Sequence, residues 1–356
     1  MDIRQPVRPA LPKVYLARDH GAEAVRAGIR EGRLVRVRPG AYVDTVEDEA
    51  PWARRERFLL ARCVAVARQL GPGHVVSHTA AALMHGLRLW RIDDAVHVSQ
   101  EGTVTNQRSP FVERHRAVLP ADDVTMVGGI RVTSVERTIE DCALTLHPRD
   151  ALVVLDSAMR LLTQPDRWRR PESDRRAEEL RWLLSERLEA RATRRGKRTA
   201  RSVLAHADPF AESAPESVLR WIAVSRGLPR PVSQFRVTTG RGTFFSDMGW
   251  TVERVAPVGG RGSGFTVHAE FDGRVKYRGA DGSDGADAAR AVVDEKLRED
   301  ALREMGDRVR RFVTEDLGRP ARTFERLCSA FPPGVTKRLR PVPELMPPPG
   351  RAGEEG

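Results

Sequence analysis

Hydrophobic positions at two different spacings divide the first part of the chain into a helix and a hairpin. Val25 and Ile29 lie one helical turn apart and predict a short helix over residues 22–31. Over residues 34–38 valines alternate with arginines, and a Pro-Gly turn then leads back into a second short apolar stretch. A helix followed by a basic β-hairpin is typical of a winged helix-turn-helix module.

A module of this kind places its helix in the major groove of DNA and its hairpin against the phosphates. The arginines that would face the DNA are Arg30, Arg33, Arg36 and Arg38. A hairpin with a purely structural role would carry arginines on its solvent face equally well. The pattern therefore predicts a winged-helix-like module over residues 1–50 and leaves DNA binding as one of two interpretations.

Residues 51–163 carry apolar residues mainly at helical spacing, most clearly over residues 52–70 and 151–162. The sequence TSVE, in which Thr133 precedes Glu136 by three positions, matches a capping box and predicts the start of a further helix. The pattern predicts a mostly helical middle domain with a few short strands.

Residues 164–207 are highly charged and predict an exposed helix and a linker, with Trp168 and Trp182 as the large apolar anchors. Residues 332–356 are expected to form a disordered tail, because the end of the chain is rich in proline, glycine and glutamate.

Three histidines lie close together in the sequence: His74, His78 and His85. The spacing can place His78 and His85 on one face of a helix. No carboxylate accompanies them, so the pattern favours structural histidines over a metal site.

An α/β pattern over residues 208–331 predicts a separate C-terminal domain. A second capping box, from Ser213 to Glu216, opens a helix that reaches Arg226. The further predicted elements are strands over residues 232–238, 243–247, 265–271 and 308–313, and a long helix over about residues 288–305.

Acidic residues gather where two of these strands would meet. Because side chains alternate between the faces of a strand, His268, Glu270 and Asp272 share one face. Asp247 ends the preceding strand and lies close to Glu270 if the two strands pair. Carboxylates at this spacing repel each other unless a cation joins them, and Mg²⁺ is commonly held by one or two carboxylates. We therefore expect Asp247 and Glu270 to bind magnesium.

Two of the five lysines of the chain fall in the same region. Lys276 follows the turn after Asp272, and Lys296 lies on the predicted long helix. An amine near a metal-bound phosphate can stabilise the charge that develops there. Two alternatives stay open: Lys296 can form an i, i+4 salt bridge with Asp300, and Glu216 can act as a capping residue alone.

Composition sets the broad class of protein. The 356 residues are 40% hydrophobic and 31% charged, which fits a folded protein of two or three domains. The formal charge of +11 favours a polyanionic partner such as DNA, although the positive charge is nearly all arginine and coding bias can produce it. The chain shows no apolar membrane span and no signal core, so we expect a cytoplasmic protein. The widely spaced Cys63, Cys142 and Cys328 predict reduced thiols.

Two parts of the chain resemble known families. The C-terminal part resembles the very-short-patch-repair-like branch of the PD-(D/E)xK nuclease superfamily in four ordered segments: SAPESVLRWIAVSRGLPRP, FFSDMGW, HAEFDGRVKYRG and VVDEKLREDALREMGDRVRRFVTEDL. The N-terminal part resembles actinobacterial AbiEi-type antitoxin-domain proteins of abortive infection, in the segments GIREGRLVRVRPGAYV, VSHTAAALMHGL and TSVERTIEDCAL. Together the resemblances cover most of the chain and imply a restriction-endonuclease-like C-terminal domain.

The nuclease resemblance implies roles for individual residues. Asp247 matches the metal-binding aspartate, Glu270 matches the acid of the (D/E)xK element, and Glu216 matches a supporting glutamate on the first helix. Asp272 occupies the position of the lysine in that element, so Lys296, or else Lys276, would have to replace it.

These observations predict a multidomain α+β protein that binds DNA and carries a magnesium-dependent endonuclease-like domain, which would hydrolyse phosphodiester bonds. The alternative is an antitoxin-like transcriptional regulator of a toxin–antitoxin or phage-defence locus, with an inactive nuclease fold and a cognate toxin locus as its partner.

Overall fold

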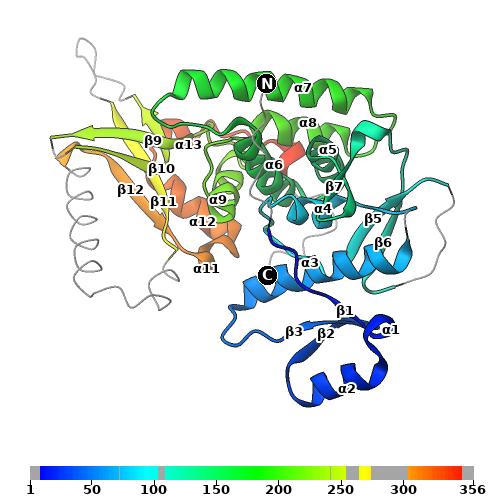
Figure 1. Cartoon of the computed structure of the whole chain (residues 1–356). Coiled ribbons are helices and arrows are strands. Elements are labelled where there is room, and N and C mark those ends of the chain that lie inside the picture. Colours follow the sequence, from blue (N-terminus) through cyan, green and yellow to red (C-terminus); the bar gives the residue numbers. More distant parts are fainter. Residues whose placement is uncertain are drawn as a thin grey trace, which may run out of the picture. The chain divides into compact units, whose positions relative to one another are not determined.

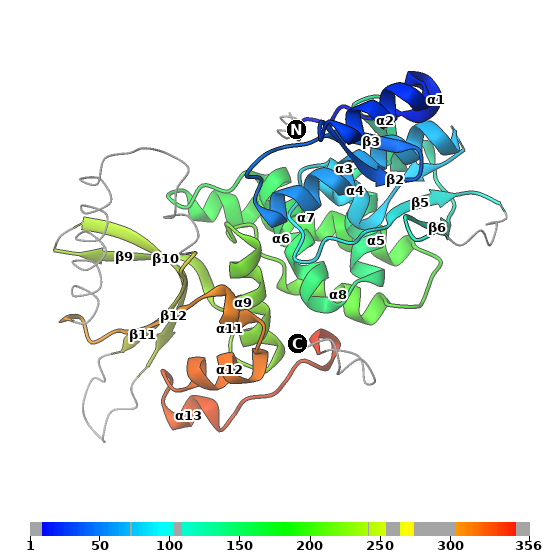
Figure 2. The same cartoon turned by 90° about the horizontal axis from the view of Figure 1, so that it is seen from below.

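The computed structural model describes residues 9–71, 73–102, 109–240, 242–253, 264–273 and 304–346. The fold is mixed α+β, and the chain divides into two compact units (Figures 1 and 2). Unit 1 contains residues 1–146 and 180–201, and unit 2 contains residues 147–179 and 202–356. Each unit is therefore built from two separate stretches of chain. No helix in the described part of the chain has the length and apolar character that crossing a bilayer requires.

Unit 1 begins with a small antiparallel sheet and two short helices. These elements are β1 (Tyr15–Leu16), α1 (Ala17–His20), α2 (Ala22–Arg30), β2 (Leu34–Arg38) and β3 (Ala41–Asp44). β3 pairs with both β1 and β2 and is the central strand. The alternation predicted for β2 is present, since Val37 is buried and Arg36 is exposed. α2 lies close to β2 at Gly28, where a Cβ atom would meet the Leu34 side chain at 2.7 Å.

A long helix and a second sheet complete the N-terminal part of unit 1. They are α3 (Pro51–Leu70) and, in spatial order, β6 (Val112–Arg116), β5 (Val96–Gln100), β4 (Val75–Val76), β8 (Ile130–Thr133) and β7 (Val124–Val127). Leu59 and Cys63 of α3 share one core with Val43 of the small sheet and Val98 of the large sheet. α3 thus joins the two sheets of unit 1 (Figure 1).

α4 (His78–Met84) and α5 (Val135–Thr145) pack next to each other in unit 1. The start of α5 was predicted from a capping box that begins at Thr133, but the N-cap is Ser134, whose Oγ accepts a hydrogen bond from the backbone N of Arg137 at 3.2 Å. The Thr133 hydroxyl instead bonds to the hydroxyl of Thr138 at 2.7 Å. The helix prediction is confirmed, and the predicted cap is wrong by one residue.

α7 (Arg170–Ala190) and α8 (Lys197–His206) each contribute residues to both units. The predicted apolar anchors of this region are mostly exposed: Trp168 is 57% exposed and Trp182 is 67% exposed. Trp168 contacts Phe245 edge-on, with 4.9 Å between ring centroids. Both tryptophans, which the sequence analysis names as the apolar anchors of this region, are thus largely in solvent.

Ion pairs fix the C-terminal part of α7 in unit 1. Arg187 donates to Asp123 Oδ1 at 2.7 Å and to Glu140 Oε1 at 2.5 Å. Arg191 donates to Glu140 Oε2 at 3.1 Å and to Asp141 Oδ1 at 3.0 Å. All three carboxylates are buried, so the arginines supply the charge compensation that buried acids require.

Unit 2 contains a four-stranded sheet and several helices. Its elements are α6 (Pro148–Thr163), α9 (Ala214–Ser225), β9 (Val232–Thr239), β10 (Gly242–Val252), β11 (Phe265–Phe271), β12 (Arg308–Phe312), α11 (Thr314–Leu317), α12 (Pro320–Cys328), α13 (Pro333–Thr336) and η3 (Pro343–Leu345). The strand order is β12-β11-β10-β9, and only the β11–β12 pair among them is parallel. α9 and α12 lie on the same side of this sheet in both views (Figures 1 and 2).

The second capping box is confirmed at the start of α9. The Ser213 hydroxyl accepts from the backbone N of Glu216 at 3.3 Å and donates to Glu216 Oε1 at 2.7 Å. The four predicted strands are also present, although β10 continues to Val252, well beyond its predicted end. The helix predicted over residues 288–305 lies almost wholly outside the described residues.

A fully buried ion pair joins α6 to α9. Arg220 Nη2 lies 2.5 Å from Asp156 Oδ2, and both side chains are 1% exposed. The backbone N of Asp208 donates to Asp156 Oδ1 at 2.7 Å, and the Ser233 hydroxyl donates to Asp208 Oδ2 at 2.9 Å. The network reaches the start of the sheet at β9 and fixes four segments of unit 2 together.

Candidate functional site

The first candidate site is the basic surface of α2 and β2. Arg30, at the end of α2, is exposed, as are Arg33 in the following turn and Arg36 on β2. Arg33 forms an exposed ion pair with Glu31, at 2.5 Å. Exposed pairs of this kind contribute little to stability and exchange readily, so the guanidinium stays accessible to another anion.

Arg38 differs from the other three predicted DNA-contacting arginines. Its side chain is partly buried, and it lies near Arg62 and Arg114. Burial lowers the pKa of Arg38, and the positive charges of Arg114 and Arg62 lower it further. The structure therefore separates a solvent-facing set, Arg30, Arg33 and Arg36, from a partly buried cluster that contains Arg38.

The second candidate site is the predicted acidic site in unit 2. β10 and β11 pair antiparallel in a register that places Met248 opposite Ala269. Asp247 directly precedes Met248 on β10, and Glu270 directly follows Ala269 on β11. The two residues therefore occupy adjacent positions at the end of the ladder, as the assumed strand pairing requires.

The partners of the two carboxylates differ. Asp247 Oδ2 accepts a hydrogen bond from the backbone N of Phe271 at 2.7 Å, whereas Glu270 Oε2 lies 3.5 Å from Arg311 Nε on β12. In the part of the chain that the structure describes, neither acid belongs to a group of three potential metal ligands with all ligand atoms within 4.8 Å of one another. Magnesium binding by Asp247 and Glu270 remains a prediction.

Glu216 caps the start of α9 and also has a raised pKa. Its Oε2 accepts from the backbone N of Glu212 at 2.8 Å, in addition to the capping contact with Ser213. Burial and the negative charge of Asp247 raise the pKa of Glu216 to about 7. The side chain therefore lies in the electrostatic field of Asp247, where we expected a supporting glutamate.

Of the remaining residues of the predicted site, the structure describes Asp272 and His268. Asp272 lies just after β11 and is half-buried. Lys276 and Lys296 lie outside the described residues. His268 is fully buried: its Nδ1 lies 2.8 Å from the Ser246 hydroxyl and its Nε2 lies 3.3 Å from Asp307 Oδ2, so its contacts are structural.

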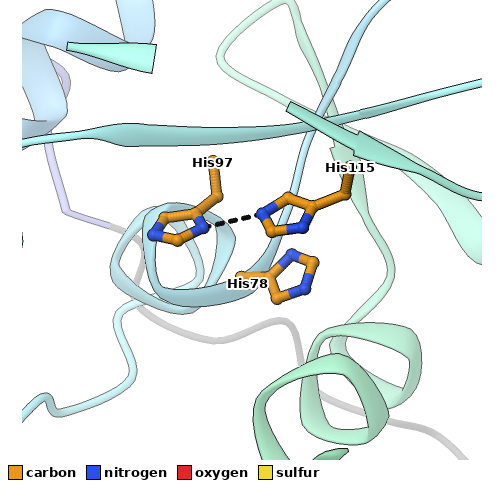
Figure 3. Close-up of side chains that lie close together, drawn as sticks. All are labelled: His78, His97 and His115. Carbon is orange, nitrogen blue, oxygen red and sulfur yellow. Dashed lines mark hydrogen bonds between the residues drawn. The ribbon is translucent and has the colours of Figure 1, made fainter. Parts of the chain in front are cut away.

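A cluster of three histidines in unit 1 was not predicted. His78 begins α4, His97 lies on β5 and His115 lies on β6 (Figure 3). β5 and β6 are parallel neighbours, with Ser99 opposite His115, so His97 and His115 emerge from the same face of the sheet. The ring centroid of His115 lies 3.9 Å from that of His78 and 5.1 Å from that of His97.

His85, which was expected to share a helix face with His78, lies elsewhere. Its Nε2 donates to the backbone O of Thr133 at 2.7 Å. Burial lowers the pKa of His78 well below its ordinary value, and the charges that His115 and His97 can carry add to this effect. Burial also lowers the pKa of His115, again with a contribution from His97.

Comparison with known proteins finds a family match in the middle of the chain. Residues 75–190 match the family model described as the AbiEi antitoxin C-terminal domain. No curated protein matches the chain. Among solved structures, the crystal structure of the RV2827C protein from Mycobacterium tuberculosis is similar, at 16% sequence identity and a TM-score of 0.29 over 55% of this chain and 76% of that chain.

The family match supports the AbiEi-type part of the resemblance described above. The matched residues run from β4 to the end of α7 and include all three histidines of the cluster.

Proposed function

We propose that this chain is an AbiEi antitoxin-like transcriptional regulator that binds DNA through the basic helix and hairpin of residues 22–44. The match of residues 75–190 to the AbiEi antitoxin C-terminal domain carries the proposal. The order of elements in residues 15–44 supports it. β1 is followed in the chain by α1, α2 and the β2–β3 hairpin, and it pairs with β3, as in winged-helix modules.

The exposed arginines define how the module would contact DNA. Arg30 lies at the end of α2, Arg33 in the following turn and Arg36 on β2, so this segment offers three exposed guanidinium groups to phosphates. Phosphate contacts of this type position a protein on DNA and make its affinity depend on salt.

Binding of the full chain to DNA tests the proposal directly. We expect the wild type to bind a labelled duplex from the region upstream of its own gene more tightly than a scrambled duplex. In the triple variant R30A/R33A/R36A, the slope of log K against log salt should fall by about 3, because each phosphate contact contributes about 0.9. Fluorescence anisotropy over a range of salt concentrations measures this slope.

A matched control removes the same charge elsewhere. R169A/R175A/R194A changes three arginines that are exposed and lie outside residues 22–44. We expect its salt slope to equal that of the wild type. An unchanged slope in R30A/R33A/R36A, or an equal loss in the control, would contradict the assignment of the DNA-binding face.

A cognate toxin is the partner that this function implies. A gene for a nucleotidyltransferase-type toxin next to the gene of this protein would favour the proposal. Expression of that gene alone should then arrest growth, and co-expression of this chain should restore it. Growth arrest that persists on co-expression would remove the antitoxin role and leave DNA binding to be judged separately.

A second candidate function is phosphodiester hydrolysis in unit 2. It is favoured by the register of β10 and β11, which brings Asp247 and Glu270 to adjacent positions, and by the raised pKa of Glu216 beside Asp247. In this candidate, Asp247 and Glu270 hold Mg²⁺, Glu216 supports the metal site, and Lys296 or Lys276 stabilises charge on the phosphate.

Plasmid nicking in the presence of Mg²⁺ tests the second candidate. D247A and E270A should abolish nicking, whereas E315A, which removes an exposed acid of unit 2, should leave it unchanged. Equal nicking by all four proteins would assign any cleavage to a contaminant, and the absence of nicking would favour an inactive nuclease-like domain.

A further inference from the structure

The histidine cluster of unit 1 has the composition and spacing of a transition-metal site. His78, His97 and His115 each offer one ring nitrogen, and the three nitrogens all lie within 4.8 Å of one another. His97 Nδ1 and His115 Nε2 are the closest pair, at 2.9 Å. Figure 3 shows the three rings turned toward one another from a helix start and two neighbouring strands.

A carboxylate completes the set of possible donors. Glu113 lies on β6, two residues before His115, and its side chain is on the same face of the sheet. Its Oε2 lies 3.9 Å from His97 Nδ1, and its Oε1 lies 3.8 Å from His115 Nε2. The carboxylate therefore faces both ring nitrogens that form the closest pair.

The outer contacts of two rings orient them for metal binding. His97 Nε2 lies 3.5 Å from Asp93 Oδ2, which leaves Nδ1 directed at the cluster. His78 Nδ1 lies 2.9 Å from the Ser77 hydroxyl. Histidine ligands of zinc almost always contact a carboxylate, a carbonyl or water through the nitrogen that does not bind the metal, and this fixes the ring and its tautomer.

His78 has a backbone conformation that few side chains adopt. Its φ angle is +51°, and the residue is only 5% exposed. A residue other than glycine in this region is uncommon, and such strain persists where the surrounding structure fixes it, often at functional sites. The conformation directs the first residue of α4 toward the two strands.

We propose that His78, His97, His115 and Glu113 form a binding site for one Zn²⁺ ion. Three imidazoles and one carboxylate give the four-coordinate set of nitrogen and oxygen donors that zinc accepts. In a tetrahedral site with bonds of about 2.0–2.1 Å, ligand nitrogens lie about 3.4 Å apart, so the His97–His115 pair has to separate by only about 0.5 Å. The proton between these two rings moves to the outer nitrogen of one of them.

The location explains what such an ion would do. It would link α4 to β5 and β6 within the region that matches the AbiEi antitoxin C-terminal domain. The ligand side chains also provide an entry path, since Glu113 is 56% exposed and His115 is 24% exposed, whereas His78 is buried. The site is independent of the DNA-binding face proposed above.

Metal titration of the full chain, prepared without a histidine tag and treated with a chelator, tests the site. We expect one equivalent of Zn²⁺ to bind in competition with a chromophoric chelator, and Co²⁺ to give the intense visible absorption of four-coordinate cobalt. H115A and H97A should lose this absorption. D93N, which alters the carboxylate that faces the outer nitrogen of His97, should weaken Zn²⁺ binding by about 10- to 100-fold.

Two further variants distinguish a loss of metal binding from a loss of folding. E113Q alters an exposed side chain and should weaken Zn²⁺ binding while far-ultraviolet circular dichroism stays unchanged. H20Q removes an exposed histidine outside the cluster and should bind like the wild type. Zinc binding that is absent in the wild type, or equally strong in wild type, H115A and E113Q, would overturn the proposal.

Discussion

Two neighbouring arginines on β2 illustrate how position decides the role of a residue. Arg36 is exposed on one face, whereas Arg38 is partly buried close to Arg62 and Arg114. The alternation of valine and arginine predicts the faces of the strand but not which arginines meet other parts of unit 1. Arg38 is therefore a weaker candidate for contacting DNA than Arg36.

A second single residue, Glu216, gives a prediction about how stability depends on pH. Its pKa is raised to about 7 by burial and by Asp247, so the folded protein binds more protons than the unfolded chain between about pH 4.5 and 7. Stability should therefore fall as pH rises through this window and level off above it. In E216Q this part of the pH dependence should disappear, as measured by urea unfolding at several pH values.

The control for Glu216 is an exposed acid in the same unit. E315Q should keep the pH dependence of the wild type, because the Glu315 side chain is exposed to solvent and is not buried on folding. A wild-type stability that rises between pH 4.5 and 7 relative to E216Q would show that the carboxylate is stabilised in its charged form.

At the scale of helices and strands, buried charges connect elements that are distant in the sequence. Arg220 on α9 and Asp156 on α6 are both 1% exposed and contact each other at 2.5 Å. Because each ion compensates the other in an apolar environment, removal of one leaves a buried charge without its counterion.

A double-mutant cycle on this pair tests the consequence. D156L alone should destabilise unit 2 by about 3–5 kcal/mol, since it removes the ion-pair partner of the buried Arg220. The double variant D156L/R220M should lose much less than the sum of the two single changes. Urea unfolding followed by tryptophan fluorescence measures the difference, and strictly additive losses would contradict the coupling.

Local sequence patterns predicted the elements better than the contacts between them. The capping box from Ser213 to Glu216 is a short-range signal and is confirmed. The burial of β11 does not alternate, since His268 and Glu270 are buried like Val267 and Ala269. The histidine cluster was missed because His78, His97 and His115 meet only through the parallel pairing of β5 and β6. The spacing of residues along the chain does not encode such a pairing.

The same limit applies to the two candidate sites. The adjacency of Asp247 and Glu270 followed from assuming that consecutive strands pair, which antiparallel neighbours commonly do.

The exposure of Trp182 could not be foreseen, since a large apolar residue among charges usually marks a buried face. The C-terminal part of α7 is instead held in unit 1 by Arg187 and by Arg191, which follows the helix, and charged surface residues give no sign of their partners.

For the whole molecule, the main feature is that both units are discontinuous in sequence. Unit 1 is completed by residues 180–201, which follow the first stretch of unit 2. Arg187 and Arg191 from this return segment contact the buried carboxylates of Asp123, Glu140 and Asp141. The return segment therefore belongs to the structure of unit 1 and is not a linker between domains.

Loss of these contacts should loosen unit 1 locally. In R187M/R191M, backbone amides of α5 should exchange with deuterium faster than in the wild type, because Glu140 loses both Arg187 and Arg191 and Asp141 keeps only Arg137. R169M/R175M removes two exposed arginines and should leave this exchange unchanged. Equal exchange in all three proteins would show that the return segment is dispensable for α5.

The discontinuity of unit 1 also sets an order of events during protein synthesis. At about 5–20 residues per second, a ribosome needs on the order of 10–40 s to reach residue 201. Until then the nascent N-terminal part can form its helices and hairpins, and Arg137 can pair with Asp123 and Asp141, but Glu140 lacks its partners Arg187 and Arg191. A fragment that ends before α7 would lack these partners of Glu140 permanently, so expression of unit 1 on its own has to include the segment through residue 201.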